Sequence, residues 1–242
     1  MMQSKERNDL KKGITKADIR YLLQQLSGPY WLMGALLYSA GLRPPQCVAL
    51  RVRDLDLIQQ RLQIAEQHSA ILAPQLVPHL KLHLSRLRTR HLKALAMGGG
   101  WVALPSSPHV SRHWSSQYLF PAPGFVLNSN GLQIRYPFPE ARLINAIDCA
   151  ARSLPIDVGC TAMSAFDLRR ALALHLVENG CPVQSMKAYL GLAQDSPSSA
   201  LWEFNEAALH RVFRDIFSPR LLGQQPHPDF ISEPAACYRI AS

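Results

Sequence analysis

Apolar residues recur at helical spacing in the first fifty residues of the chain. Residues 1–13 are polar and charged, and we expect a flexible arm there. Thr15 and Asp18 form a capping-box pattern, which predicts a helix with apolar positions at Ile19, Leu22, Leu23 and Leu26. A strongly apolar helix is predicted from Trp31 to Ser39. The Pro44-Pro45 pair favours a further short helix, because proline fits a first helical turn.

Short strands and one long helix are predicted next. A turn at Gln59-Gln60 should join two short strands, and a third should follow, at residues 54–56, 62–65 and 70–72. Pro74 to about Met97 predicts a helix whose leucines face inward, at Leu80, Leu84, Leu87 and Leu95. Residues 101–139 show little periodicity and predict a long loop.

The C-terminal third is helical by pattern. Amphipathic or capped segments predict four helices, at residues 140–153, 164–179, 182–190 and 198–217. Residues 218–242 contain four prolines, and we expect an extended tail. The predicted fold class is therefore mainly α with a small antiparallel β-sheet, and the length allows one large domain or two small ones.

Positive charge is concentrated in the middle of the chain. The 242 residues have a net charge of +9 and are 48% hydrophobic, which excludes a wholly disordered chain. Residues 67–139 contain no Asp or Glu and carry seven basic residues, Lys81, Arg86, Arg88, Arg90, Lys93, Arg112 and Arg135. Such a block favours a polyanionic partner, nucleic acid before an anionic membrane, although a solvated face without a partner is an equally good interpretation.

Neither a disulfide framework nor a metal site is expected. The five cysteines are scattered, odd in number and without a CxxC pair, which favours a reducing cytoplasm. We expect Cys47 and Cys149 to be small core residues. His79/His83 and His109/His113 have helical i,i+4 spacing, but no further ligands accompany them. No cofactor is indicated.

Two stretches of sequence resemble the catalytic domain of the tyrosine recombinase (phage integrase) family. Residues 36–43 and 48–56 read LLYSAGLR and VALRVRDLD, where the family has LLYxTGLRxxELxxLxxxDID. Residues 166–173 read FDLRRALA and lead to Gly180 and YLGL at 189–192, where the family has HxLRHxFAxxLxxxG and then LGH. The segments WVALP at 101–105 and YLFP at 118–121 look like the integron-integrase branch.

This resemblance covers residues 14–217 and implies a tyrosine-recombinase catalytic-domain-like fold. The pattern begins almost at once, so the resemblance implies that the family's N-terminal DNA-clamping domain is absent. Family members cleave DNA with a tyrosine hydroxyl, and two arginines hold the scissile phosphate. The resemblance places these arginines at Arg43 and Arg169. Guanidinium groups suit that role because they stay charged and offer a planar fork of donors.

The other catalytic positions of the family are not filled. The two histidine positions carry Phe166 and Leu192, and the position of the nucleophile carries Trp202, whose indole cannot attack phosphorus. The displaced nucleophile candidates are Tyr189, at a position that is normally packing, and Tyr238 in the tail.

The family's general acid is also missing. It is a lysine on the β-hairpin, but the matching residues 66–71 contain none. His68 lies in this segment and could in principle donate a proton in place of the lysine, but we expect an exposed hairpin histidine. Arg170 replaces a further histidine and adds a cation beside Arg169.

Three functional hypotheses follow from these residues. The first is a catalytically inactive protein that binds double-stranded DNA and acts in transcription, recombination or mobile-element maintenance. Its phosphate contacts would be Arg43, Arg169, Arg170, His68, Lys81, Arg86, Arg88, Arg90 and Lys93. The second is a divergent active recombinase with a displaced tyrosine. The third is a protein-interaction module, in which residues 198–242 mediate self-association or contact another DNA-binding protein.

Overall fold

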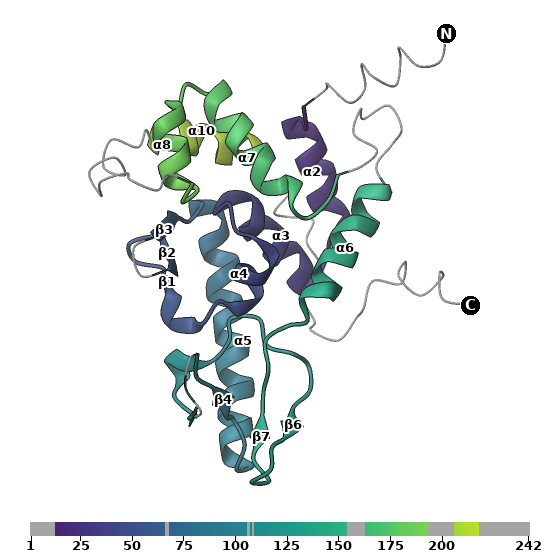
Figure 1. Ribbon diagram of the computed structural model, residues 1–242, viewed down its shortest axis with the longest axis vertical. Helices are drawn as coiled ribbons and strands as arrows, with labels where there is room; N and C mark the ends of the chain where they lie inside the picture. The colour runs from purple at the N-terminus through teal and green to yellow at the C-terminus, as the bar shows by residue number, and fades with distance from the viewer. Residues whose placement is uncertain are drawn as a thin grey trace.

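A group of helices forms the upper part of the molecule, and the long helix α5 runs down from it into a lobe of short strands (Figure 1). The computed structural model describes residues 13–65, 68–105, 107, 109–153, 163–192 and 206–217. Residues 1–12, most of the predicted arm, lie outside the described residues, as does the predicted tail. The mainly α fold with small antiparallel sheets is confirmed.

The first three helices follow the predicted order. In α2 (Lys16–Gln25), the hydroxyl of Thr15 accepts a hydrogen bond from the Asp18 amide at 3.2 Å, and the Asp18 carboxylate accepts one from the Thr15 amide at 2.7 Å. The predicted capping box is therefore present. Helix α3 (Gly28–Ser39) begins three residues earlier than expected, because Pro29 fits its first turn. Helix α4 (Pro44–Ala49) follows.

A three-stranded antiparallel sheet lies beside these helices in the order β1-β2-β3. A short 3₁₀ turn, η1 (Val52–Asp54), leads into β1 (Leu55–Asp56), β2 (Arg61–Ala65) and β3 (His68–Ile71). Gln60 has a φ of 52°, in the turn predicted at residues 59–60. Leu62 pairs with Ala70, and both side chains are buried. The third strand begins two residues before its predicted start, which brings His68 into the sheet.

The lower lobe replaces the long loop predicted at residues 101–139. Helix α5 (Val77–Ala96) follows the 3₁₀ turn η2 (Pro74–Leu76). The first hairpin pairs β4 (Val102–Ala103) with β5 (Val110–Ser111), and the 3₁₀ turn η3 (Trp114–Ser116) follows it. The second hairpin pairs β6 (Val126–Leu127) with β7 (Gln133–Ile134). Strands of two residues are too short to produce a visible alternation of apolar and polar positions. The prediction of one long loop is therefore wrong.

Arginines bind carbonyls and aromatic rings inside this acid-free lobe. Arg112 donates to the carbonyls of Gly99 (3.0 Å) and Leu95 (3.1 Å), and its guanidinium lies over the ring of Trp101 at 5.1 Å. Arg88 lies 5.0 Å from the centroid of the Trp114 ring. Part of the acid-free basic segment at residues 67–139 therefore stabilises the lobe internally.

Buried Arg51 connects the lobe to the upper body. Its guanidinium donates to the carbonyls of Ser116 (2.5 Å) and Ala103 (2.8 Å) and to the hydroxyl of Tyr118 (3.1 Å). The guanidinium also lies 4.3 Å from the centroid of the Tyr118 ring. Because Arg51 lies two residues beyond the end of α4, these bonds fix the lobe against the end of that helix.

The described C-terminal helices are α6 (Glu140–Arg152), α7 (Asp167–Glu178), α8 (Val183–Tyr189) and α10 (Glu206–Ile216). Of these helices, α6 and α7 pack on α3, α8 packs on α7 and β3, and α10 packs on α2 and α7. Helix α7 begins three residues later than predicted, because the Asp167 carboxylate accepts hydrogen bonds from the amide and hydroxyl of Ser164. A 2.5 Å ion pair between Lys16 and Asp215 connects α10 to α2. The predicted helix at 198–217 is described only from residue 206.

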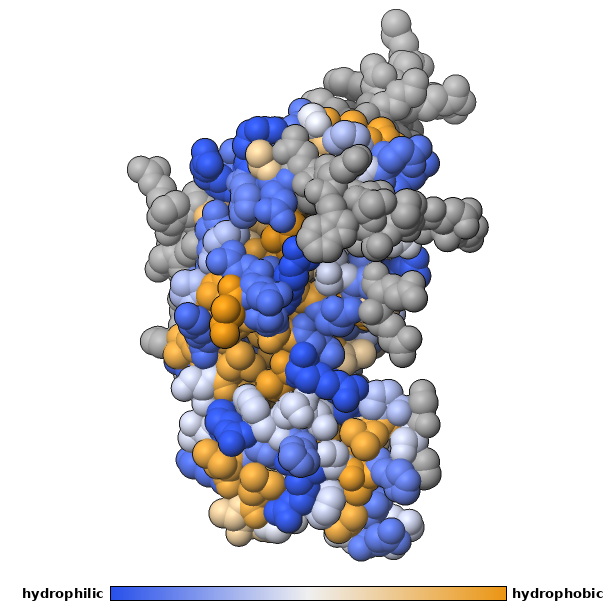
Figure 2. All heavy atoms as spheres, turned by 90° about the vertical axis from the view of Figure 1, so that its left-hand side faces the viewer, coloured by the Kyte–Doolittle hydropathy of each residue, from blue (hydrophilic) through white to orange (hydrophobic). Residues whose placement is uncertain are grey.

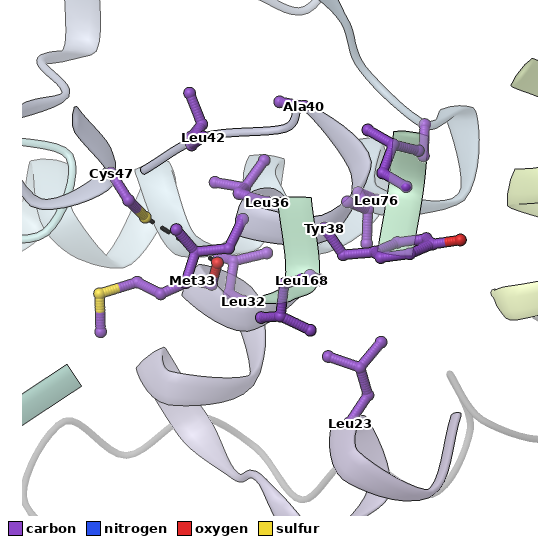
Figure 3. Packing of buried hydrophobic residues seen from close by; sticks show 14 of the residues in the cluster. Leu23, Leu32, Met33, Leu36, Tyr38, Ala40, Leu42, Cys47, Leu76 and Leu168 are labelled. Carbon is purple, nitrogen blue, oxygen red and sulfur yellow. Dashed lines mark hydrogen bonds between the residues drawn. The ribbon is translucent and has the colours of Figure 1, made fainter. Parts of the chain in front are cut away.

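Helix α3 lies in the middle of the hydrophobic core (Figure 3). Its residues Met33, Leu36 and Tyr38 are fully buried, together with Leu168 of α7. The Tyr38 hydroxyl lies 2.8 Å from Nδ1 of His175, whose Nε2 is 2.8 Å from the carbonyl of Ile14. Since a carbonyl only accepts, Nε2 donates and Nδ1 accepts the tyrosine proton. This chain of bonds satisfies two polar groups in an apolar core.

The two cysteines predicted for the core differ in burial. Cys47 is fully buried, and its thiol lies 3.9 Å from the Met33 carbonyl. Cys149 is only half-buried. In the described part of the chain, no helix combines the length and apolar character needed to cross a bilayer.

Candidate nucleic-acid interface

Arg43 is presented at the start of α4. Its backbone amide donates to the side-chain oxygen of Gln46 at 2.8 Å, and Pro44 opens the helix directly after it. The side chain of Arg43 is exposed. The preceding Gly41 has a φ of +60°, and a Cβ on it would lie 2.4 Å from Cδ2 of Leu190. A glycine is therefore required here for the loop to pass against the end of α8.

Arg169 joins the first turn of α7 to two other segments. It donates from Nη1 to the Gly41 carbonyl at 2.5 Å and from Nη2 to the Leu190 carbonyl. Burial lowers the pKa of Arg169, and the nearby positive charge of Arg43 lowers the same pKa further. The structure thus brings the two arginines singled out in the sequence, 126 positions apart, into one electrostatic neighbourhood.

His68 belongs to the same corner of the molecule. Its Nε2 lies 2.8 Å from the carbonyl of Tyr189, and its ring is packed against Gly191. The side chain is half-buried, so the expectation of an exposed hairpin histidine is wrong. Because the carbonyl only accepts, Nε2 donates this hydrogen bond.

Exposed apolar side chains flank this corner where the sequence resemblance expects histidines. Phe166, just before α7, is 57% exposed, and Leu192, just after α8, is 51% exposed. Neither Phe166 nor Leu192 can donate or accept a proton, so these positions supply no acid–base group. Arg170 is also exposed. The side of the molecule that carries the three-stranded sheet and α8 shows hydrophobic residues interspersed with hydrophilic ones (Figure 2).

Tyr189 lies under the corner in the core. It is 1% exposed, and its hydroxyl lies 3.0 Å from the Ser39 carbonyl and 3.3 Å from the Ile71 carbonyl. Burial raises its pKa well above the ordinary value. Trp202 and Tyr238 lie outside the described residues.

The predicted phosphate contacts on α5 fall into two groups. Lys81, Arg88 and Lys93 are exposed, although Arg88 also lies against Trp114. Arg86 and Arg90 are half-buried. The 20 residues of α5 span about 30 Å, so these side chains are spread along the molecule. Arg90 lines a pocket with Arg135, a residue that the sequence offered only as part of the basic block.

The histidine pairs do not form metal sites in the described structure. His83 is fully buried on α5, with Nε2 2.7 Å from the Leu119 carbonyl. His109 and His113 lie on either side of β5 rather than on one helix, so the i,i+4 spacing does not place them on a common helix face. Nowhere in the described ranges do three or more His, Cys, Asp or Glu side chains gather as metal ligands.

Comparison with known proteins places this geometry in context. A protein named integrase/recombinase from Escherichia coli and another of the same name from Pseudomonas aeruginosa are each 26% identical to the chain over 189 residues. The chain is similar to integrase/recombinase proteins. The match covers 74% of this chain and 55% of each relative, so the chain spans about half the length of the curated relatives it matches.

Two further comparisons complete this picture. No family model matches the chain. Among solved structures, an integrase from mycobacterium phage Brujita aligns with a TM-score of 0.47 and 15% identity, over 89% of this chain and 63% of that one.

Proposed function

We propose that this chain is a DNA-binding protein related to the tyrosine recombinase catalytic domain, of integron-integrase-like character, that holds duplex DNA without cleaving it. The observation that carries the proposal is the pairing of Arg43 with Arg169. Two guanidinium groups share one neighbourhood, and no carboxylate in the described residues forms an ion pair with either. Adjacent like charges cost free energy, and a phosphate diester between them would offset that cost.

The positioning of Arg169 supports this role. Two of its N–H groups are used on the carbonyls of Gly41 and Leu190. A guanidinium has five N–H donors, so further donors remain for a ligand. Exposed Arg43 and Arg170 add charge at the same corner, and the basic side chains of α5 extend it.

The loss of cleavage rests mainly on sequence. Phe166 and Leu192 replace two proton-transfer residues, and Trp202 replaces the nucleophile. The burial of Tyr189 and the bonds of its hydroxyl to carbonyls argue against its use as a displaced nucleophile. A protein of this kind would act in the cytoplasm as an accessory or regulatory factor in transcription, recombination or mobile-element maintenance.

Fluorescence anisotropy with a labelled duplex tests DNA binding. We expect binding at low salt, with log K falling linearly against log[salt] by about 0.9 for each phosphate contact. If the chain binds no duplex even at about 20 mM salt, the proposal is contradicted. A pull-down with and without nuclease then separates DNA contacts from the alternative of a protein-interaction module acting through residues 198–242.

A covalent-trapping experiment tests the absence of cleavage. A pool of nicked suicide duplexes of random sequence is incubated with the wild type and with Tyr238→Phe. We expect no covalent adduct with either protein. An adduct formed by the wild type and lost in the variant would instead establish a divergent recombinase that uses Tyr238.

A further inference from the structure

A pocket in the lower lobe lies between α5 and the hairpin segments, away from the residues that hold Arg169. It is lined by Arg90, His91, Gln117, Tyr118 and Arg135, together with a few apolar groups. The hollow is small and open to solvent, so a ligand would bind at its mouth rather than in an enclosed cavity. The two arginines come from segments 45 positions apart and meet only in the folded lobe.

The pocket is positively charged and partly dehydrated. Burial lowers the pKa of Arg135, and burial together with the charge of Arg135 lowers the pKa of Arg90. Burial and the surrounding arginines also lower the pKa of His91. In the described structure no ion pair joins Arg135 to a carboxylate, and residues 67–139 contain none. A dehydrated cation without a counter-charge is costly, so the pocket favours an anion.

The geometry of the donors suits a tetrahedral oxyanion. Guanidinium groups bind such ligands through paired N–H donors, and Arg90 on α5 and Arg135 directly after β7 both line the pocket. Tyr118 accepts a hydrogen bond from Arg51 at 3.1 Å, so its own hydroxyl proton can be donated. We propose that this pocket binds a phosphate group through Arg90 and Arg135.

The position of the pocket makes a DNA phosphate one natural source of this ligand. Arg43 and Arg51 flank α4, whose six residues span about 9 Å, and Arg51 holds Tyr118 at the pocket wall. Base pairs in a duplex are spaced by about 3.4 Å, so a strand that contacts Arg43 has further phosphates within reach. In this form the inference rests on the proposed DNA-binding function. Free phosphate is the other source of the same chemistry.

Two measurements on the full chain separate these sources. In the first, thermal unfolding is followed in inorganic phosphate and in chloride of equal ionic strength. At phosphate about fivefold above its Kd, the Tm of the wild type should rise by about 2–4 °C. In Arg135→Gln this rise should disappear, while its Tm in chloride should equal or exceed that of the wild type, because a buried charge is removed. Arg135→Lys should retain only part of the rise.

In the second measurement, duplex affinity is followed against salt. Arg135→Gln should reduce the slope of log K by about 0.9 if the pocket holds a backbone phosphate. Arg152→Gln, which removes an exposed charge at the end of α6, is the matched control and should behave as the wild type in the phosphate melts. A lost Tm rise with an unchanged DNA slope supports a phosphate pocket and assigns it to free phosphate.

The outcomes distinguish this inference from the proposed function. If wild-type protein binds no DNA but its phosphate-dependent Tm rise is lost in Arg135→Gln, the DNA-binding proposal fails and the pocket stands. If DNA binding is intact and Arg135→Gln matches the wild type in both measurements, the phosphate pocket is overturned and the DNA-binding proposal stands.

Discussion

Replacing Arg43 and Arg169 separately with glutamine distinguishes an arginine proposed only to contact DNA from one that also stabilises the folded chain. Arg43 is exposed, and its hydrogen bonds within the described structure involve its backbone amide and carbonyl. Arg169 donates to the carbonyls of Gly41 and Leu190 and is half-buried. The two substitutions remove the same charge from different structural settings.

The expected stability changes differ for this reason. Arg43→Gln should change the free energy of unfolding by less than about 0.5 kcal/mol, as for most exposed positions. Each charge-assisted bond of Arg169 contributes about 1.5–3 kcal/mol, and relief of the repulsion from Arg43 offsets part of the loss. We therefore expect Arg169→Gln to lower the free energy of unfolding by about 2–4 kcal/mol in urea titrations.

The effects on DNA should be similar for the two variants. In the proposed mode of DNA binding each variant loses one phosphate contact, so duplex affinity should fall about 10- to 100-fold and the salt slope by about 0.9. Folded Arg169→Gln must be confirmed by circular dichroism before titration. Arg43→Lys keeps the charge without the fork and should recover the salt slope but only part of the affinity. An unchanged salt slope in Arg43→Gln, or equal stability of the two variants, would refute this reasoning.

Three further predictions concern the fold that supports the site. Burial lowers the pKa of His83 to about 4, so between about pH 6.5 and 4 the imidazole takes up a proton only in the unfolded state. From this residue alone, the free energy of unfolding in urea should fall by up to about 3 kcal/mol over that range. In His83→Gln the free energy of unfolding should fall less over the same pH range. Gly41→Ala should lower the free energy of unfolding by about 2–3 kcal/mol, because its Cβ would meet Leu190. Gly180→Ala should lower it by only about 1–2 kcal/mol, because Gly180 has a φ of +82° but open space around its Cβ position. Equal losses in the two variants would contradict a steric clash at Gly41. Arg51→Met should lower stability by about 3 kcal/mol and increase amide exchange in the lower lobe, and unchanged exchange would show that Arg51 does not hold it.

The helices of the upper body were largely predictable because their signals are local. The capping box at Thr15 and the proline start of α4 involve residues within one turn of each other. The long α5 was also predictable from the spacing of its leucines. The two hairpins of the lower lobe were not, because their two-residue strands carry no periodic pattern. Contacts of Arg112 and Arg51 with distant carbonyls and rings stabilise them instead.

The candidate site was only partly predictable. Resemblance to recombinases drew attention to Arg43 and Arg169, and the structure brings them into one neighbourhood. His68 was expected to be exposed, yet it packs on the end of α8, a contact between residues 121 positions apart. Arg135 gave no signal beyond its place in an acid-free stretch. That absence of acids was nevertheless informative, since no arginine within the stretch can pair with a carboxylate from the stretch itself.

By itself, the sequence determined the helical character of the chain, the positions of most helix ends and the concentration of positive charge in residues 67–139. These properties depend on composition and on neighbours a few residues away. Only the tertiary structure decided which cations remain available to a ligand. Burial and bonding commit Arg51 and Arg112 to the interior of the protein, leave Arg43 exposed, and bring Arg90 and Arg135 to one pocket. The strength of a charge depends on its dehydration and its neighbours, and both are set by packing between distant segments.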